Sequence, residues 1–108
     1  MIKVTVLYPS SEGGRFDMDY YLSTHLPLCQ ELLGEACKGT EAELGLNGGA
    51  PGVPAPFVAQ GHLYFDSEAS FQEAFAANAG PIMSDVANYT DLAPVMVVSE
   101  LKGTRAEL

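Results

Sequence analysis

The longest helical pattern in the chain, residues 16–33, places the strongest constraint on the fold. Its apolar residues recur with the period of an α-helix, so one stripe must face a core. At about 100° per residue, His25 lies within this stripe, one turn after Tyr21, whereas Tyr20 points away from it. Asp17 precedes the stripe and is expected to cap the helix. A titratable ring on a core-facing stripe needs either a structural or a catalytic explanation.

Pro27 interrupts this helical pattern. A proline inside a helix removes a backbone hydrogen bond and crowds the preceding turn. We therefore expect a kink or a break at residues 25–26, with a slip in the phase of the stripe after Leu26. Gly34 is expected to end the helix.

Four segments show the composition or the alternation of β-strands: residues 2–8, 38–48, 57–65 and 94–101. The last of these is apolar on both sides as far as Val98, which predicts a central or doubly covered strand.

A second helical pattern follows Asp66 and Ser67, one of which is expected to be its N-cap. Gly80 and Pro81 are expected to stop this helix and to start a short helical turn over residues 82–87.

The order of elements is β-α-β-β-α-β, which predicts an α+β class and the ferredoxin-like plan. In that plan a four-stranded antiparallel sheet carries two helices on one face. Leu7, Met96 and Val98 are expected to leave the other face apolar. Exposed apolar patches of this kind mark interfaces, so we expect a homodimer that packs sheet against sheet.

Length and charge narrow the class of protein. The 108 residues suffice for one domain, assigned to residues 1–103, with a frayed tail at 104–108. The formal net charge of −9 argues against nucleic acid as a partner, because binding phosphates requires clustered Lys and Arg. No apolar run reaches the roughly 18 residues of a membrane span. The expected compartment is therefore the cytoplasm, without membrane association.

His25 is the leading catalytic candidate, and Tyr21 is its expected partner. An imidazole ring titrates near neutrality and can move a proton, and a neutral buried ring can act as a base. Tyr21 can hydrogen-bond to that ring or to a substrate oxygen. The structural alternative is that His25 only anchors the kink before Pro27, by bonding a freed carbonyl.

Three further residues are candidates for substrate binding. His62 lies mid-strand beside Gly61, where a ligand can approach closely, and it faces either the pocket or the dimer interface. Tyr8 ends the first strand and can line a pocket mouth. Asp17 lies at the edge of the helical stripe, although capping is its simplest role.

Other polar or aromatic residues are given structural roles. Cys29 is expected to be a small core residue, Tyr89 to pack in a core or an interface, and Asp85 to cap or turn the chain. The two histidines, 37 positions apart, make no metal-binding pattern. No dinucleotide or phosphate-binding motif is present, so neither a metal nor a cofactor is expected.

Three segments resemble the EthD family: LYP with FDMDYYLSTHLPL, then HLYFDSEASFQEAF, then SDVANYTDLAPVMVVSE. The resemblance spans about residues 4–101, and its most specific part is the segment with the paired tyrosines and His25. It implies the dimeric α+β barrel form of the ferredoxin-like fold, with a pocket between helices and sheet. Relatives in the wider superfamily include lactone isomerases, cofactor-free and haem-degrading monooxygenases, and polyketide dehydratases.

The resemblance implies the fold more strongly than the reaction. Our leading hypothesis is a cofactor-independent isomerase, dehydratase or monooxygenase acting in small-molecule degradation. It would act on a hydrophobic, oxygenated small molecule, such as an aromatic, lactone or polyketide-like compound. His25 would be its general acid or base, and Tyr21 would orient an oxygen. The alternatives are a non-catalytic dimeric binding protein that uses the same pocket, and a structural dimer with a filled interior.

Overall fold

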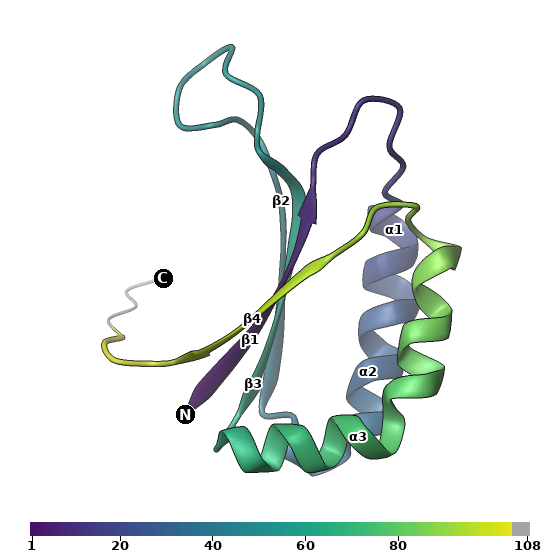
Figure 1. The fold of residues 1–108 in the computed structure, drawn as a ribbon, viewed down its shortest axis with the longest axis vertical. Helices are drawn as coiled ribbons and strands as arrows, with labels where there is room; N and C mark the ends of the chain where they lie inside the picture. The colour runs from purple at the N-terminus through teal and green to yellow at the C-terminus, as the bar shows by residue number, and fades with distance from the viewer. Residues whose placement is uncertain (105–108) are drawn as a thin grey trace.

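One antiparallel sheet organises the computed structural model, which describes residues 1–104 (Figure 1). Its strands are β1 (Ile2–Pro9), β2 (Gly39–Leu44), β3 (Phe57–Phe65) and β4 (Val95–Glu100), in the order β2-β3-β1-β4. The predicted tail at 104–108 lies outside the described residues, apart from Thr104.

The helices lie together on one face of the sheet, as Figure 1 shows. They are α1 (Met18–Tyr20), the π-helical turn η1 (Tyr21–His25), α2 (Leu26–Leu33), α3 (Glu68–Asp85) and the short 3₁₀ turns η2 (Gly34–Ala36) and η3 (Val86–Asn88). The predicted α+β, ferredoxin-like fold is confirmed. In the part of the chain that the structure describes, we find no helix with the length and apolar character needed to cross a bilayer.

The first helix starts where it was predicted to start but does not break at Pro27. The carboxylate of Asp17 accepts a hydrogen bond of 3.0 Å from the amide of Tyr20 and so caps the helix. Before the proline, the chain widens into η1, where the amide of Leu26 bonds the carbonyl of Tyr21 five residues earlier. A π-helical turn absorbs the proline without ending the helix. Leu22, within this turn, is 51% exposed, whereas its neighbour Tyr21 is buried.

Gly80 and Pro81 were predicted to end the second long helix, and this prediction is wrong. α3 continues through Pro81 to Asp85 and changes direction along its length (Figure 1). The proline removes one hydrogen bond, but Ile82, immediately after it, is buried in the core. Packing of the second half of the helix offsets the lost bond.

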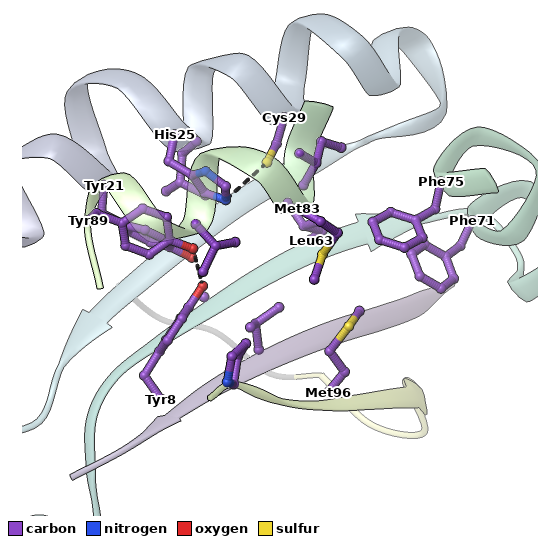
Figure 2. Close-up of a pocket in the computed structure, with 16 residues that line it drawn as sticks. Tyr8, Tyr21, His25, Cys29, Leu63, Phe71, Phe75, Met83, Tyr89 and Met96 are labelled. Carbon is purple, nitrogen blue, oxygen red and sulfur yellow. Dashed lines mark hydrogen bonds between the residues drawn. The ribbon is translucent and has the colours of Figure 1, made fainter. Parts of the chain in front are cut away.

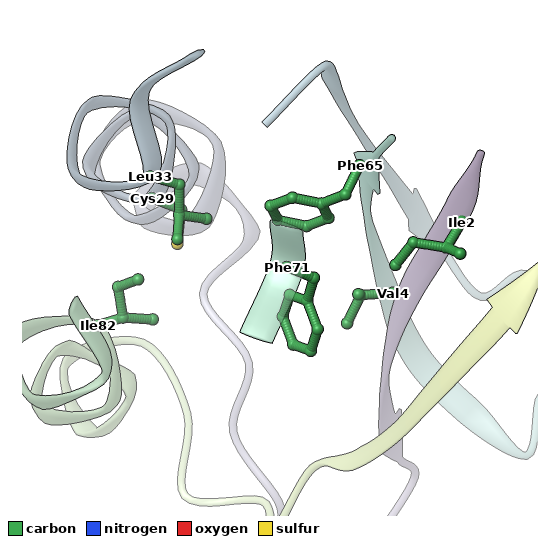
Figure 3. Packing of buried hydrophobic residues seen from close by; sticks show 7 residues of the cluster. All are labelled: Ile2, Val4, Cys29, Leu33, Phe65, Phe71 and Ile82. Atoms are coloured by element: carbon green, nitrogen blue, oxygen red, sulfur yellow. The ribbon is translucent and has the colours of Figure 1, made fainter. Parts of the chain in front are cut away.

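The core fills the space between the helices and the inner face of the sheet (Figure 3). Val4 and Phe65, on neighbouring strands, are fully buried. Phe71 and Ile82 of α3 and Leu33 of α2 pack against them. The predicted strand at residues 2–8 is confirmed as β1, and its buried residues, Ile2, Val4 and Tyr8, share one face.

β4 is an edge strand, and its prediction as a central or doubly covered strand is wrong. Its apolar residues from Val95 to Val98 are 43–49% exposed. Met96 pairs with Val6 and Val98 with Val4, so both lie on the face that carries the helices. The prediction that Met96 and Val98 lie on the open face is therefore wrong. The apolar residues of the open face are Leu7, which was predicted there, Val95 and Val97. A strand that is apolar on both sides does not reveal its own position in a sheet.

Candidate functional site

A cavity lies between the helices and the inner face of the sheet (Figure 2). Its volume is about 50 Å³ for water-sized molecules, and the atom-free space rises to about 580 Å³ only when the part open to solvent is included. Its walls come from β1, η1, α2, β3, α3 and β4 and are mostly apolar. The polar groups that reach it are those of Tyr8, Tyr21, His25, Cys29 and Tyr89. Apolar walls with a few convergent polar groups are typical of small-molecule sites.

His25 is the central polar group of the cavity. It ends η1, is only 4% exposed, and lies one turn after Tyr21 on the inward side of the helix. Its Nδ1 atom lies 2.9 Å from Oδ2 of Asp85, and its Nε2 atom lies 3.6 Å from the sulfur of Cys29. The ring therefore bonds two side chains, and the alternative in which it anchors a freed carbonyl is not observed.

Asp85 is hydrogen-bonded to Nδ1 of His25, the ring nitrogen that does not contact Cys29. Its Oδ1 atom also accepts hydrogen bonds from the hydroxyl of Tyr20, at 2.6 Å, and from the amide of Asn88, at 2.9 Å. Burial by itself raises the pKa of this carboxyl. The bonds from Tyr20, Asn88 and His25 outweigh burial and hold its pKa below the ordinary value.

The ionised Asp85 fixes the tautomer of His25. A carboxylate only accepts hydrogen bonds, so Nδ1 carries a proton, and in the neutral ring Nε2 presents its lone pair to Cys29 and the cavity. Nε2 is therefore the atom of this site that can take a proton from a bound molecule.

Three tyrosines gather beside His25. The hydroxyls of Tyr8 and Tyr89 lie 2.7 Å apart, and the ring of Tyr21 packs edge-on against both neighbours at 5.8 and 5.1 Å between centroids. Figure 2 shows the hydroxyl ends of these rings turned toward one another. Burial raises the pKa of all three phenols, so each hydroxyl keeps its proton at neutral pH and can donate it in a hydrogen bond.

Gly61 makes room for Tyr21. A Cβ atom at position 61 would collide with the hydroxyl of Tyr21, which lies over this point of β3. The sequence indicated close approach at Gly61, and the approaching group is a side chain of the same chain.

The structure brings together three of the five predicted site residues. His25, Tyr21 and Tyr8 all line the cavity. His62 lies on the open face of the sheet, where Nδ1 bonds Thr5 at 2.9 Å and Nε2 bonds Glu43 at 2.6 Å. Asp17 is exposed at the start of the helix. Strand alternation explains why His62 points away from the cavity, because Gly61 faces inward and the next residue must face outward.

Sequence reasoning missed three residues of this site, namely Cys29, Asp85 and Tyr89. Each had been given a structural role because each is common in cores, caps or turns. One signal could have found the last two. Asp85 and Tyr89 are four positions apart at the end of a helical pattern, which places them on one side of the chain.

Among the described residues, no three His, Cys, Asp or Glu side chains are grouped in a way that would hold a metal ion.

A cavity lined by His25 is what both the enzyme and the binding-protein hypotheses require.

Comparison with known proteins identifies the family. The family model described as EthD domain matches residues 15–93. A crystal structure of an EthD-like protein from Ralstonia eutropha JMP134 is 44% identical, with a TM-score of 0.93 over 97% of this chain and 95% of that one. An EthD family protein from Bacillus halodurans C-125 is 21% identical, with a TM-score of 0.71 over 94% and 98%.

A more distant likeness concerns the fold alone. HapK from Hahella chejuensis is 11% identical, with a TM-score of 0.57 over 98% of each chain. No curated protein matches the chain significantly. The domain match covers most of the chain, and it includes the π-helical turn with His25 and the segment with Asp85 and Tyr89. The chain therefore belongs to the EthD family.

Proposed function

We propose that this protein is a cofactor-independent enzyme that moves a proton on a hydrophobic, oxygenated small molecule. One observation carries the proposal: Nδ1 of His25 is held by Asp85, so that its Nε2 atom faces an apolar cavity. Aromatic, lactone and polyketide-like compounds are the expected substrates, since they combine apolar surface with a carbonyl or hydroxyl oxygen.

In the proposed reaction, Nε2 of His25 takes a proton from the substrate. Asp85 stabilises the imidazolium that forms, and the negative charge moves to the substrate oxygen. The hydroxyls of Tyr8, Tyr21 and Tyr89 are the donors within the cavity that can stabilise this oxygen. His25 then returns the proton to a different atom, which isomerises the substrate or prepares it for elimination.

The test is hydrogen exchange into a panel of small ketones, lactones and phenols in heavy water, followed by NMR. We expect exchange with the native protein and a loss of about 10²-fold or more in His25→Asn, the usual range for general acid–base catalysis. Free imidazole should restore part of the rate in His25→Ala. If neither variant alters the exchange of a substrate that the native protein turns over, His25 is not the base.

A binding protein without turnover is the alternative, and one observation favours it. Nε2 of His25 is in contact with the thiol of Cys29, so a ligand must compete for that atom before it can react. A molecule that binds in the cavity, protects the protein against unfolding and is recovered unchanged would support this alternative.

We also propose that two copies form a homodimer by packing their open sheet faces together. Leu7, Val95 and Val97 give this face an apolar half, and the edge of β4 beside them is unpaired in a single chain. Burying such a surface is the usual reason for association. The EthD resemblance implies the same arrangement.

A further inference from the structure

Cys29, His25 and Asp85 form a continuous array of thiol, imidazole and carboxylate. The sulfur of Cys29 lies 3.6 Å from Nε2 of His25, and Nδ1 of His25 lies 2.9 Å from Asp85. Cys29 follows His25 by one helical turn and lines the cavity, with 3% of its surface exposed (Figure 2). A nucleophile beside a base that is oriented by a third group is the arrangement of nucleophilic catalysis.

We propose that Cys29 is a nucleophile and that the ligand class of the cavity is an α,β-unsaturated carbonyl compound, to which the thiol adds. The inference rests on the proposed function, because His25 moves the proton in both. A thiol is a soft nucleophile suited to a polarised carbon–carbon double bond. Conjugate addition requires neither a leaving group nor water, which fits a cavity with mostly apolar walls.

The addition needs no reactant other than the ligand and the residues of the site. The proton on the sulfur of Cys29 passes to Nε2 of His25 as the sulfur bonds the β-carbon of the ligand. The π electrons of the double bond move toward the carbonyl and form an enolate, whose oxygen takes hydrogen bonds from the tyrosine hydroxyls. His25 then returns the proton to the α-carbon, so that the adduct has the mass of protein plus ligand. The reverse sequence releases the ligand.

The environment of Cys29 explains why this chemistry needs His25. Burial, together with the nearby Cys37 and the charge of Asp85, raises the pKa of the Cys29 thiol to about 11. The group is therefore protonated at neutral pH, and only a thiol that loses its proton during attack becomes a good nucleophile. The second cysteine, Cys37, is half-buried, and its thiol donates to the carbonyl of Gly39.

The experiment uses N-ethylmaleimide, a small uncharged α,β-unsaturated carbonyl compound, with folded Cys37→Ser protein at pH 7. We expect intact-mass and peptide analysis to show one adduct per chain, located on Cys29. Replacing His25 by Asn should slow labelling about 10²-fold, the range for loss of a general base. Asp66→Asn, a change at an exposed carboxylate outside the cavity, is the control and should label at the parent rate.

Two results would overturn the inference: labelling of Cys29 only after the protein is unfolded, or an unchanged labelling rate in His25→Asn. Circular dichroism of each variant establishes that the folded state is being compared. Failure of the proposed function is distinguishable, because hydrogen exchange is measured without the maleimide. If exchange needs His25 but labelling does not, the proton-transfer proposal stands and the nucleophile is excluded. If labelling needs His25 and no compound of the panel exchanges, the nucleophile proposal stands and the proton-transfer proposal is excluded.

Discussion

The Nδ1 atom of His25 lies 2.9 Å from Oδ2 of Asp85, although the two residues are 60 positions apart in the chain. The contact joins the end of the π-helical turn to the end of α3. It sets the tautomer of the imidazole and keeps Nε2 on the inward side. The position of the catalytic candidate therefore depends on α3 as much as on its own helix.

Asp85→Asn should lower the rate of proton transfer by about 10²-fold, because misplacing a reacting group costs that order of rate. An amide can present either its oxygen or its NH₂ group to Nδ1, so the inward tautomer is no longer enforced. Steady-state kinetics on a substrate found by hydrogen exchange should show the loss in kcat with little change in KM. Asp66→Asn is the matched control at an exposed site, and a similar loss there would exclude a specific role for Asp85.

Asp85 should also make folding stability depend on acid pH. Because its pKa is lowered in the folded protein, the folded state binds fewer protons than the unfolded chain, whose carboxyls titrate near pH 3.9. Its contribution is present above that pH and is lost as the pH falls through the lower, folded-state pKa. Urea unfolding from pH 7 to pH 2 should show that the difference in free energy of unfolding between the native protein and Asp85→Asn shrinks as the pH falls. A constant difference across this range would contradict the prediction.

Gly61→Ala should destabilise the protein by about 1–3 kcal/mol, the usual cost of overpacking a core. The added Cβ would collide with the hydroxyl of Tyr21, so the Tyr21 ring must shift and proton transfer should weaken as well. Gly39→Ala is the control, because a Cβ atom in that strand would meet its nearest neighbour, the ring of Tyr64, at an ordinary 3.7 Å. Chemical denaturation measures both variants, and equal effects would argue against crowding at Tyr21.

Tyr8→Phe and Tyr89→Phe should each cost about 1–3 kcal/mol, because each leaves a buried hydroxyl without its partner at 2.7 Å. The double variant removes both hydroxyls and should cost less than the sum of the two single changes. A double-mutant cycle from urea unfolding measures this difference. Strict additivity would show that the two hydroxyls are not coupled, which would contradict a stabilising hydrogen bond between them.

The proposed homodimer should sediment at twice the chain mass of 11.5 kDa at micromolar concentration. Val97→Asp places a charge in the apolar half of the open sheet face and should produce monomers. Leu22→Asp makes the same kind of change at an exposed position on the helix and should leave the dimer intact. A native protein that sediments as a monomer would count against the proposal.

Local sequence patterns were enough to predict the strands, the first helix and the order of the elements. Two-residue alternation predicted the strands that carry Tyr8 and His62, because successive side chains of a strand point to opposite faces. Helical periodicity placed Tyr21 and His25 on one inward stripe, and Asp17 was recognised as a cap. These features depend on local geometry, which neighbouring residues fix.

Tertiary structure alone decided features that depend on competition between distant groups. Pro27 was expected to kink or break its helix and Pro81 to end its helix, but both helices continue across the prolines, with Leu26 and Ile82 buried in the interior. Which face of the sheet His62 occupies, and that β4 is an edge, followed only from strand pairing. The pairing of Asp85 with His25 has no local signature, because a hydrogen bond between residues 60 positions apart exists only once the chain has folded and excluded water from it.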